Sequence, residues 1–137
     1  MRFGSLLVSF QRYARPFRDI IATVPSSLGA LPVARDNSDF LLPLAFDEAF
    51  WIGVVPVVTS ACDNTILRAH RIGRDVMLLP ILPMYPGAQV GVVPGFARGD
   101  ELYDTFCRDT VGEIFMAVGT STARLLPIDP ESYAAHT

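Results

Sequence analysis

The sequence contains no lysine: all eleven of its basic side chains are arginines. The absence of lysine excludes Schiff-base chemistry and the lysine-containing phosphate loop of nucleotide-binding proteins. The chain also has only two histidines, His70 and His136. A histidine-based metal site would therefore need carboxylate or thiolate ligands from distant parts of the sequence. We expect no metal and no cofactor.

Cysteines and long hydrophobic runs are equally scarce. Cys62 and Cys107 lie far apart in no metal-binding spacing, which favours two buried thiols, with a single disulfide as the alternative. The longest apolar stretch, residues 49–58, is much shorter than the roughly 18 residues of a membrane-spanning helix. The apolar start of the chain ends at Gln11 without a cleavage site. We expect no membrane span, no classical signal peptide, and a location in the cytoplasm or within an assembled particle.

Charged residues make up only 18% of the chain, while 50% of it is hydrophobic. A chain of 137 residues corresponds to one domain. The charge is unevenly distributed, because residues 19–137 are acidic overall whereas residues 1–18 contain no acid. We expect a basic N-terminal arm over 1–18 and a single β-rich domain over 19–137. The arm could contact a neighbouring subunit or nucleic acid, or only keep this segment soluble. Its arginines are Arg2, Arg12, Arg15 and Arg18.

Eleven prolines break the sequence into short runs rich in Val, Ile, Leu and Phe. Such runs are typical of short strands joined by turns. The pattern predicts a mainly β fold, an antiparallel sandwich or jelly-roll-like barrel of about seven to nine strands. We expect strands near residues 17–24, 40–46, 49–59, 76–82, 89–93 and 113–118, with a short edge strand at 120–124.

Two segments have helical features. Residues 63–73 have an acidic start, basic residues near the end and a terminal glycine, but they also fit a strand followed by a tight turn at Gly73. We favour a hairpin in which Val76 begins the returning strand. Residues 100–109 place Leu102, Tyr103, Phe106 and Cys107 at helical spacing after Asp100. This spacing predicts one short helix over 100–109.

One group of residues could bind a ligand. Arg68 and His70 would share a face of a strand, where they could bind an anion. Trp51 and Tyr85 could complete a pocket, because aromatic rings stack on ligands. The alternatives are that Trp51 packs in the core and that His70 is an ordinary surface histidine between arginines.

Rigid loops rich in Pro and Gly surround Met84, Tyr85 and Phe96. If these side chains are exposed, they would be anchors for a neighbouring subunit, together with the arginines of the basic arm. If they are buried, they would instead close the ends of a sandwich.

No common catalytic motif occurs in the sequence. An enzyme would take its acid or base from Asp47 and Glu48, or from Asp63 and His70. High apolar content, a basic arm and missing catalytic motifs favour a different function. We expect a non-enzymatic structural or interaction protein that self-associates into an oligomer or larger assembly, such as a viral or phage particle. A small-ligand-binding β-barrel module is the first alternative, and a small enzyme is the second.

Overall fold

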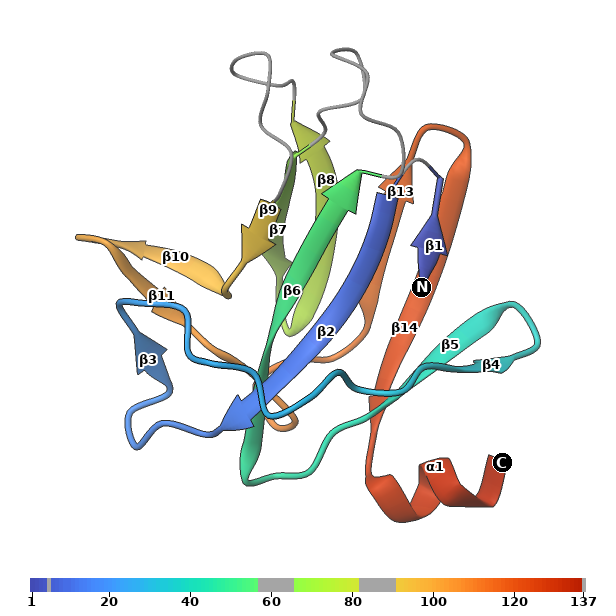
Figure 1. The fold of residues 1–137 in the computed structure, drawn as a ribbon, viewed down its shortest axis with the longest axis horizontal. Coiled ribbons are helices and arrows are strands. Elements are labelled where there is room, and N and C mark those ends of the chain that lie inside the picture. The colour runs from blue at the N-terminus through green and yellow to red at the C-terminus, as the bar shows by residue number, and fades with distance from the viewer. Residues whose placement is uncertain (5, 57–65, 82–90, 137) are drawn as a thin grey trace.

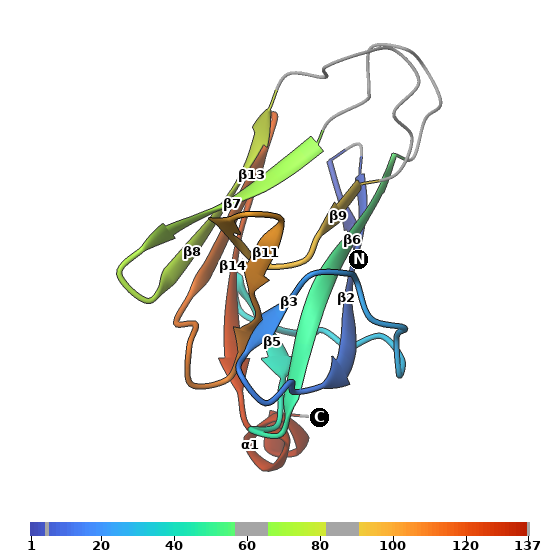
Figure 2. The same cartoon turned by 90° about the vertical axis from the view of Figure 1, so that its left-hand side faces the viewer.

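The computed structural model describes residues 1–4, 6–56, 66–81 and 91–136. It is built mainly from short strands, with one short helix among the described residues. Two larger sheets face each other as the layers of a β sandwich, and a three-stranded sheet lies at one side (Figures 1 and 2). The predicted mainly β sandwich is therefore confirmed. Its strands are more numerous than expected, because turns and register shifts divide some of the predicted runs.

The five-stranded sheet is organised around β6. This strand pairs with β2 along one side and with β12 and then β9 along the other. Alternate residues of β2 and β6 point into the sandwich, so each strand has one apolar buried face. The strands of this sheet are β1 (Arg2–Phe3), β2 (Leu6–Ala14), β6 (Glu48–Pro56), β9 (Gly91–Val93) and β12 (Phe106–Cys107).

The six-stranded sheet is the opposite layer and has the strand order β4-β5-β14-β13-β8-β7. Its pairing corrects the expectation of a purely antiparallel sandwich, because β13 runs parallel to β8 and β14 runs parallel to β5. The predicted edge strand at 120–124 is longer and lies inside this sheet. The strands are β4 (Ala34–Asp36), β5 (Asp39–Pro43), β7 (Ile66–Ile72), β8 (Asp75–Ile81), β13 (Ile114–Val118) and β14 (Ser121–Ile128).

Smaller elements cover the ends and sides of the sandwich. The three-stranded sheet consists of β3 (Ile20–Ile21), β10 (Phe96–Gly99) and β11 (Leu102–Asp104). Helix α1 (Pro130–His136) packs against β5. It begins at Pro130, and the Asp129 carboxylate accepts hydrogen bonds from the Ser132 backbone and hydroxyl.

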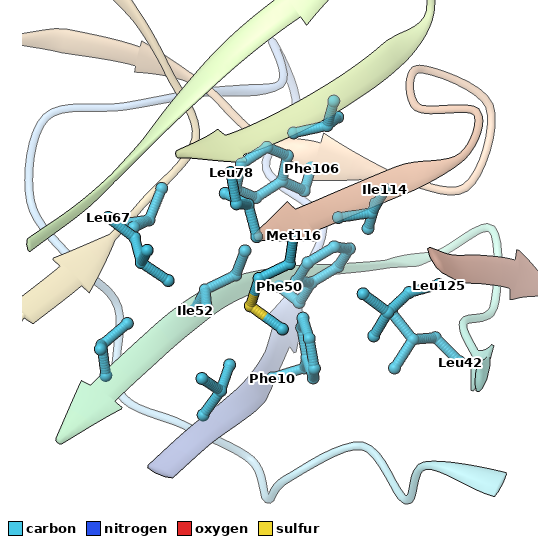
Figure 3. Packing of buried hydrophobic residues seen from close by; sticks show 14 of the residues in the cluster. Phe10, Leu42, Phe50, Ile52, Leu67, Leu78, Phe106, Ile114, Met116 and Leu125 are labelled. Carbon is cyan, nitrogen blue, oxygen red and sulfur yellow. The ribbon is translucent and has the colours of Figure 1, made fainter. Parts of the chain in front are cut away.

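The hydrophobic core fills the space between the two large sheets (Figure 3). Its centre is aromatic: the Phe50 ring stacks on Phe106 at 5.1 Å, and Phe10 contacts Phe50 edge-on. Leu78, Ile114 and Leu125 are fully buried opposite them on the six-stranded sheet. Such a core stabilises the two-layer arrangement and fixes which face of each strand is buried.

The basic N-terminal segment is not a separate arm. Residues 1–18 contain β1 and β2, and β2 is an inner strand of the five-stranded sheet. Leu6, Val8 and Phe10 of β2 are essentially fully buried in the core. The alternation of apolar and polar residues along β2 gives it one buried face, and this pattern outweighs the local excess of arginine.

The helix expected at residues 100–109 does not form, and this expectation is corrected. Asp100 and Glu101 have φ values of 50° and 62°, which makes them the turn between β10 and β11 and excludes a helix start there. Tyr103 then pairs with Ile21, and Phe106 pairs with Phe50. The apolar pairs that resembled a helical face therefore belong to two short strands in different sheets.

The hairpin favoured for the 63–73 segment is confirmed for residues 66–81. Strands β7 and β8 are joined by a two-residue turn, and Gly73 at its first position has a φ of 63°. A positive φ at this position alone is typical of a type II′ turn, which matches the twist of the two strands.

Among the described residues, no helix has the length and hydropathy needed to cross a membrane.

Candidate functional site

A groove of about 690 Å³ lies where strand β7 approaches β9 and β10. Residues 67–71 of β7 form one wall, and residues 92–97 form the other. Tyr103 and Asp104 of β11 also line the groove. Since β7 is the last strand of the six-stranded sheet, the groove follows an edge of the sandwich rather than its centre.

The β7 wall of the groove is basic. Leu67 and Ala69 contact the core, so the alternating residues Arg68 and His70 project from the opposite, solvent-exposed face. The structure thus brings together two of the residues predicted to bind a ligand. Arg71 is on the inner side, and its guanidinium carbon lies 4.0 Å from the centre of the Phe96 ring.

Phe96 and Gly95 determine the shape of the opposite wall. Phe96 is buried and contacts the Phe106 ring edge-on at 5.1 Å. At Gly95, a Cβ atom would lie 2.0 Å from the backbone oxygen of Asp104, and the φ of 155° also favours glycine. The turn between β9 and β10 can therefore pack against β11 only because residue 95 has no side chain.

Trp51, a third predicted ligand-binding residue, does not line this groove. Trp51 lies on the outer face of the five-stranded sheet, where its indole Nε1 donates a 3.0 Å hydrogen bond to the carbonyl of Pro25. The ring also lies close to Gly53, whose missing side chain leaves it space. Tyr85 lies outside the described residues. The Trp51 side chain therefore holds the loop at Pro25 against the sheet. This role is closer to the packing alternative than to a place in a ligand pocket.

A polar cluster surrounds Cys107 on the same outer face. Cys107 is a buried free thiol, and its Sγ lies 3.1 Å from the hydroxyl of Thr105. Burial raises the pKa of this thiol, so it stays protonated and is a poor nucleophile. The Arg15 guanidinium donates two hydrogen bonds of 2.8 Å to Asp19 and lowers the pKa of that carboxyl. These contacts hold the segment around β3 against the sheet; they do not create a reactive group.

Of the predicted acid–base residues, Asp47 and Glu48 lie away from the groove, whereas His70 lines it. Glu48 forms a 2.9 Å ion pair with Arg12, and Asp47 is exposed in the turn before β6. Asp63, the predicted partner of His70, lies outside the described residues. Within the described ranges, no group of three or more His, Cys, Asp and Glu side chains could hold a metal ion.

The predicted interface residues have different environments. Arg2 and Arg18 are exposed, whereas Arg12 and Arg15 form ion pairs within the chain. Phe96 is 7% exposed and packs in the core, which agrees with the alternative that it closes an end of the sandwich. Met84 and Tyr85 lie outside the described residues.

A second feature is an open apolar area on the outer face of the five-stranded sheet. Leu7 of β2 lies directly opposite Val55 of β6, and Val92 of β9 lies opposite Gly53. The exposed fractions of these three side chains are 47%, 44% and 42%. The segment around β3 covers only the other end of this face, where Tyr13, Ala49 and Cys107 form a small buried cluster with Ile21. We call Leu7, Val55 and Val92 the open patch.

Sequence reasoning finds the basic wall of the groove but misses the rest of both features. Residues 92–97 face β7 only because of pairing between distant strands, for which the sequence has no local signal. Alternation along β2 and β6 could have indicated the open patch, since Leu7 and Val55 are apolar at outward positions.

Comparison of the chain with protein-family models, curated proteins and solved structures gives no match.

Proposed function

We propose that this protein is a non-enzymatic structural or interaction protein that self-associates through the open patch. The observation that carries this proposal is the direct cross-strand pairing of Leu7 with Val55, beside Val92, on a sheet face where these three side chains are 42–47% exposed. Exposed apolar side chains occur singly on most proteins, whereas adjacent ones on a regular strand face are typical of contact surfaces.

A second copy of the same chain is the occupant that fits this surface. An apolar strand face needs no opposite charge on its partner, so it can contact its own copy across a twofold axis. A fully buried Leu or Val contributes about 1.5–3 kcal/mol relative to full exposure. Because each patch residue is a little less than half exposed, covering it contributes about 1 kcal/mol in each copy. Larger assemblies would need an additional contact.

The proposal is tested with a charge placed in the patch. We expect Val55→Lys to weaken self-association at least about 100-fold, because each twofold contact loses two apolar groups and gains two charges. Sedimentation velocity over a range of concentrations gives the dissociation constant. Circular dichroism and Trp51 fluorescence establish that the variant is folded.

The matched control is Leu79→Lys on the six-stranded sheet. Leu79 is an apolar strand residue with 36% exposure, but it faces solvent on the opposite side of the molecule. We expect this variant to associate like the wild type. If Leu79→Lys dissociates the protein and Val55→Lys does not, the contact surface is the other sheet and our assignment is wrong.

A further inference from the structure

We propose that the groove between β7 and β9–β10 binds a small organic anion: a carboxylate or phosphate group attached to a flat apolar body. The proposal does not depend on self-association, because Arg71, which would hold the ligand, lies in the groove, whereas Leu7 and Val55 of the open patch do not line it; Val92 borders both features. The groove volume of about 690 Å³ is also within the usual range for sites that hold small molecules.

The charge of the groove favours an anion. Arg71, on the inner side of β7, lines the groove and forms no ion pair with a carboxylate in the described part of the chain. Among the described lining residues Asp104 is the one carboxylate, and its Oδ1 lies 3.5 Å from the Nε of Arg98. The positive charge of Arg71 is therefore not paired with a described carboxylate in the groove, although the whole chain has a net charge of −3. An arginine without a carboxylate partner attracts anions and can hold carboxylate or phosphate oxygens in a two-pronged geometry.

The position of Arg71 suggests how the anionic group would be held. Its guanidinium lies over the Phe96 ring, and this cation–π contact restricts the side chain before any ligand binds. A guanidinium whose face is covered still presents N–H donors at its edge. Because Phe96 is itself fixed in the core, Arg71 loses little conformational freedom on binding.

The opposite wall favours a flat apolar body. Pro94 and Tyr103 line the groove on this side, whereas the ring of Phe96 is already covered by Arg71. Aromatic and aliphatic surfaces of this kind hold planar groups by stacking and by exclusion of water. A simple inorganic anion would leave this wall unused. The combination therefore favours an organic anion over phosphate or acetate alone.

The test is isothermal titration of the full chain with four probes at low ionic strength. Benzoate and phenyl phosphate carry both an anionic group and a flat body, benzamide lacks the charge, and acetate lacks the ring. We expect at least one of the first two to bind at least about tenfold more tightly than benzamide and acetate. Tighter binding of phenyl phosphate would identify a phosphate ligand, and tighter binding of benzoate a carboxylate.

Two groove variants connect the binding to the proposed residues. We expect Arg71→Gln to weaken binding of the preferred probe at least about tenfold and Arg68→Gln to weaken it less, because only Arg71 is held over the aromatic wall. Arg18→Gln is the matched control, since Arg18 is exposed and lies outside the groove. Circular dichroism establishes that all three variants fold.

The outcomes separate clearly. Probe binding that Arg71→Gln and Arg68→Gln leave unchanged would overturn the proposal, as would acetate binding as tightly as benzoate and phenyl phosphate. Neither groove variant should change the sedimentation coefficient of the protein. Failure of this site is thus distinguishable from failure of the proposed self-association.

Discussion

Replacing Gly95 by alanine tests the packing that forms the groove. A Cβ atom at this position would lie 2.0 Å from the backbone oxygen of Asp104 and 3.4 Å from the Cα of Thr105. Both contacts are with the backbone of the β11–β12 segment, so no side-chain rotation can relieve them. The turn before β10 must move away from β11, and the ring contact between Phe96 and Phe106 must change with it.

The expected cost has two parts. A φ of 155° is unfavourable for alanine, and residues in such regions cost about 1–3 kcal/mol. The displacement of packed backbone adds a cost comparable to an overpacked core position, about 1–3 kcal/mol. We therefore expect Gly95→Ala to lower the free energy of unfolding by about 4 kcal/mol and the melting temperature by more than about 10 °C.

The control is Gly119→Ala in the turn between β13 and β14. Gly119 also has a positive φ, 60°, but a Cβ atom there would have no neighbour within 4 Å. Only the backbone term remains, about 1–2 kcal/mol. Urea unfolding followed by the fluorescence of Trp51, the single tryptophan, measures both variants. Equal destabilisation by the two substitutions would refute the close packing of the β9–β10 turn on β11.

Three further predictions concern the cluster around Tyr13 and Cys107, which lies beneath the segment around β3. The Tyr13 hydroxyl is buried without a hydrogen-bond partner among the described residues, so Tyr13→Phe should leave the urea midpoint unchanged or raise the free energy of unfolding by about 1 kcal/mol; a clear loss would reveal a bond that this geometry lacks. In a Cys62→Ser background, Cys107 should react with a thiol reagent far more slowly in the native protein than in urea, because it is buried and protonated. Arg15 lowers the pKa of Asp19, so this pair stabilises the protein above the ordinary carboxyl pKa of about 4, and the stabilisation is lost as pH falls through the lower native value. Urea midpoints from pH 5 to pH 2 should therefore fall more steeply in the wild type than in Arg15→Gln, and parallel curves would contradict this assignment.

Local sequence signals predict much of the sandwich. The hairpin of β7 and β8 follows from two apolar runs around Gly73, whose conformational freedom suits the tight turn. Strand β13 follows in the same way from the short apolar run at 113–118. In both places the turn chemistry and the burial pattern favour the same structure, so short-range reasoning is sufficient.

The errors arise where distant pairing decides the structure. Leu102, Tyr103, Phe106 and Cys107 have helical spacing, but Phe106 contacts Phe50 from a strand more than fifty residues earlier. The basic composition of residues 1–18 suggests a separate basic arm, yet the apolar alternation of β2 places this segment beside β6. Charge counts average over both faces of a strand, whereas burial depends on one face at a time.

The candidate site was predictable to a similar extent. Arg68 and His70 share a strand face, as the alternation indicates, and both line the groove. Trp51 could not be separated from them by sequence, because its position on the other sheet depends on the pairing of β6 with β2. The partners of Arg71 were also hidden, since Phe96 reaches it through the arrangement of β10 beside β7.

The mass of the wild-type protein in solution tests the central claim most directly. Deletion of residues 1–18 is unsuitable for this purpose, because it would remove β2 and its core residues. Light scattering should give a mass that rises with concentration to at least twice the 15.0 kDa chain mass, and Val55→Lys should return the protein toward a single chain. A wild-type mass of 15.0 kDa at every concentration would contradict self-association through the open patch.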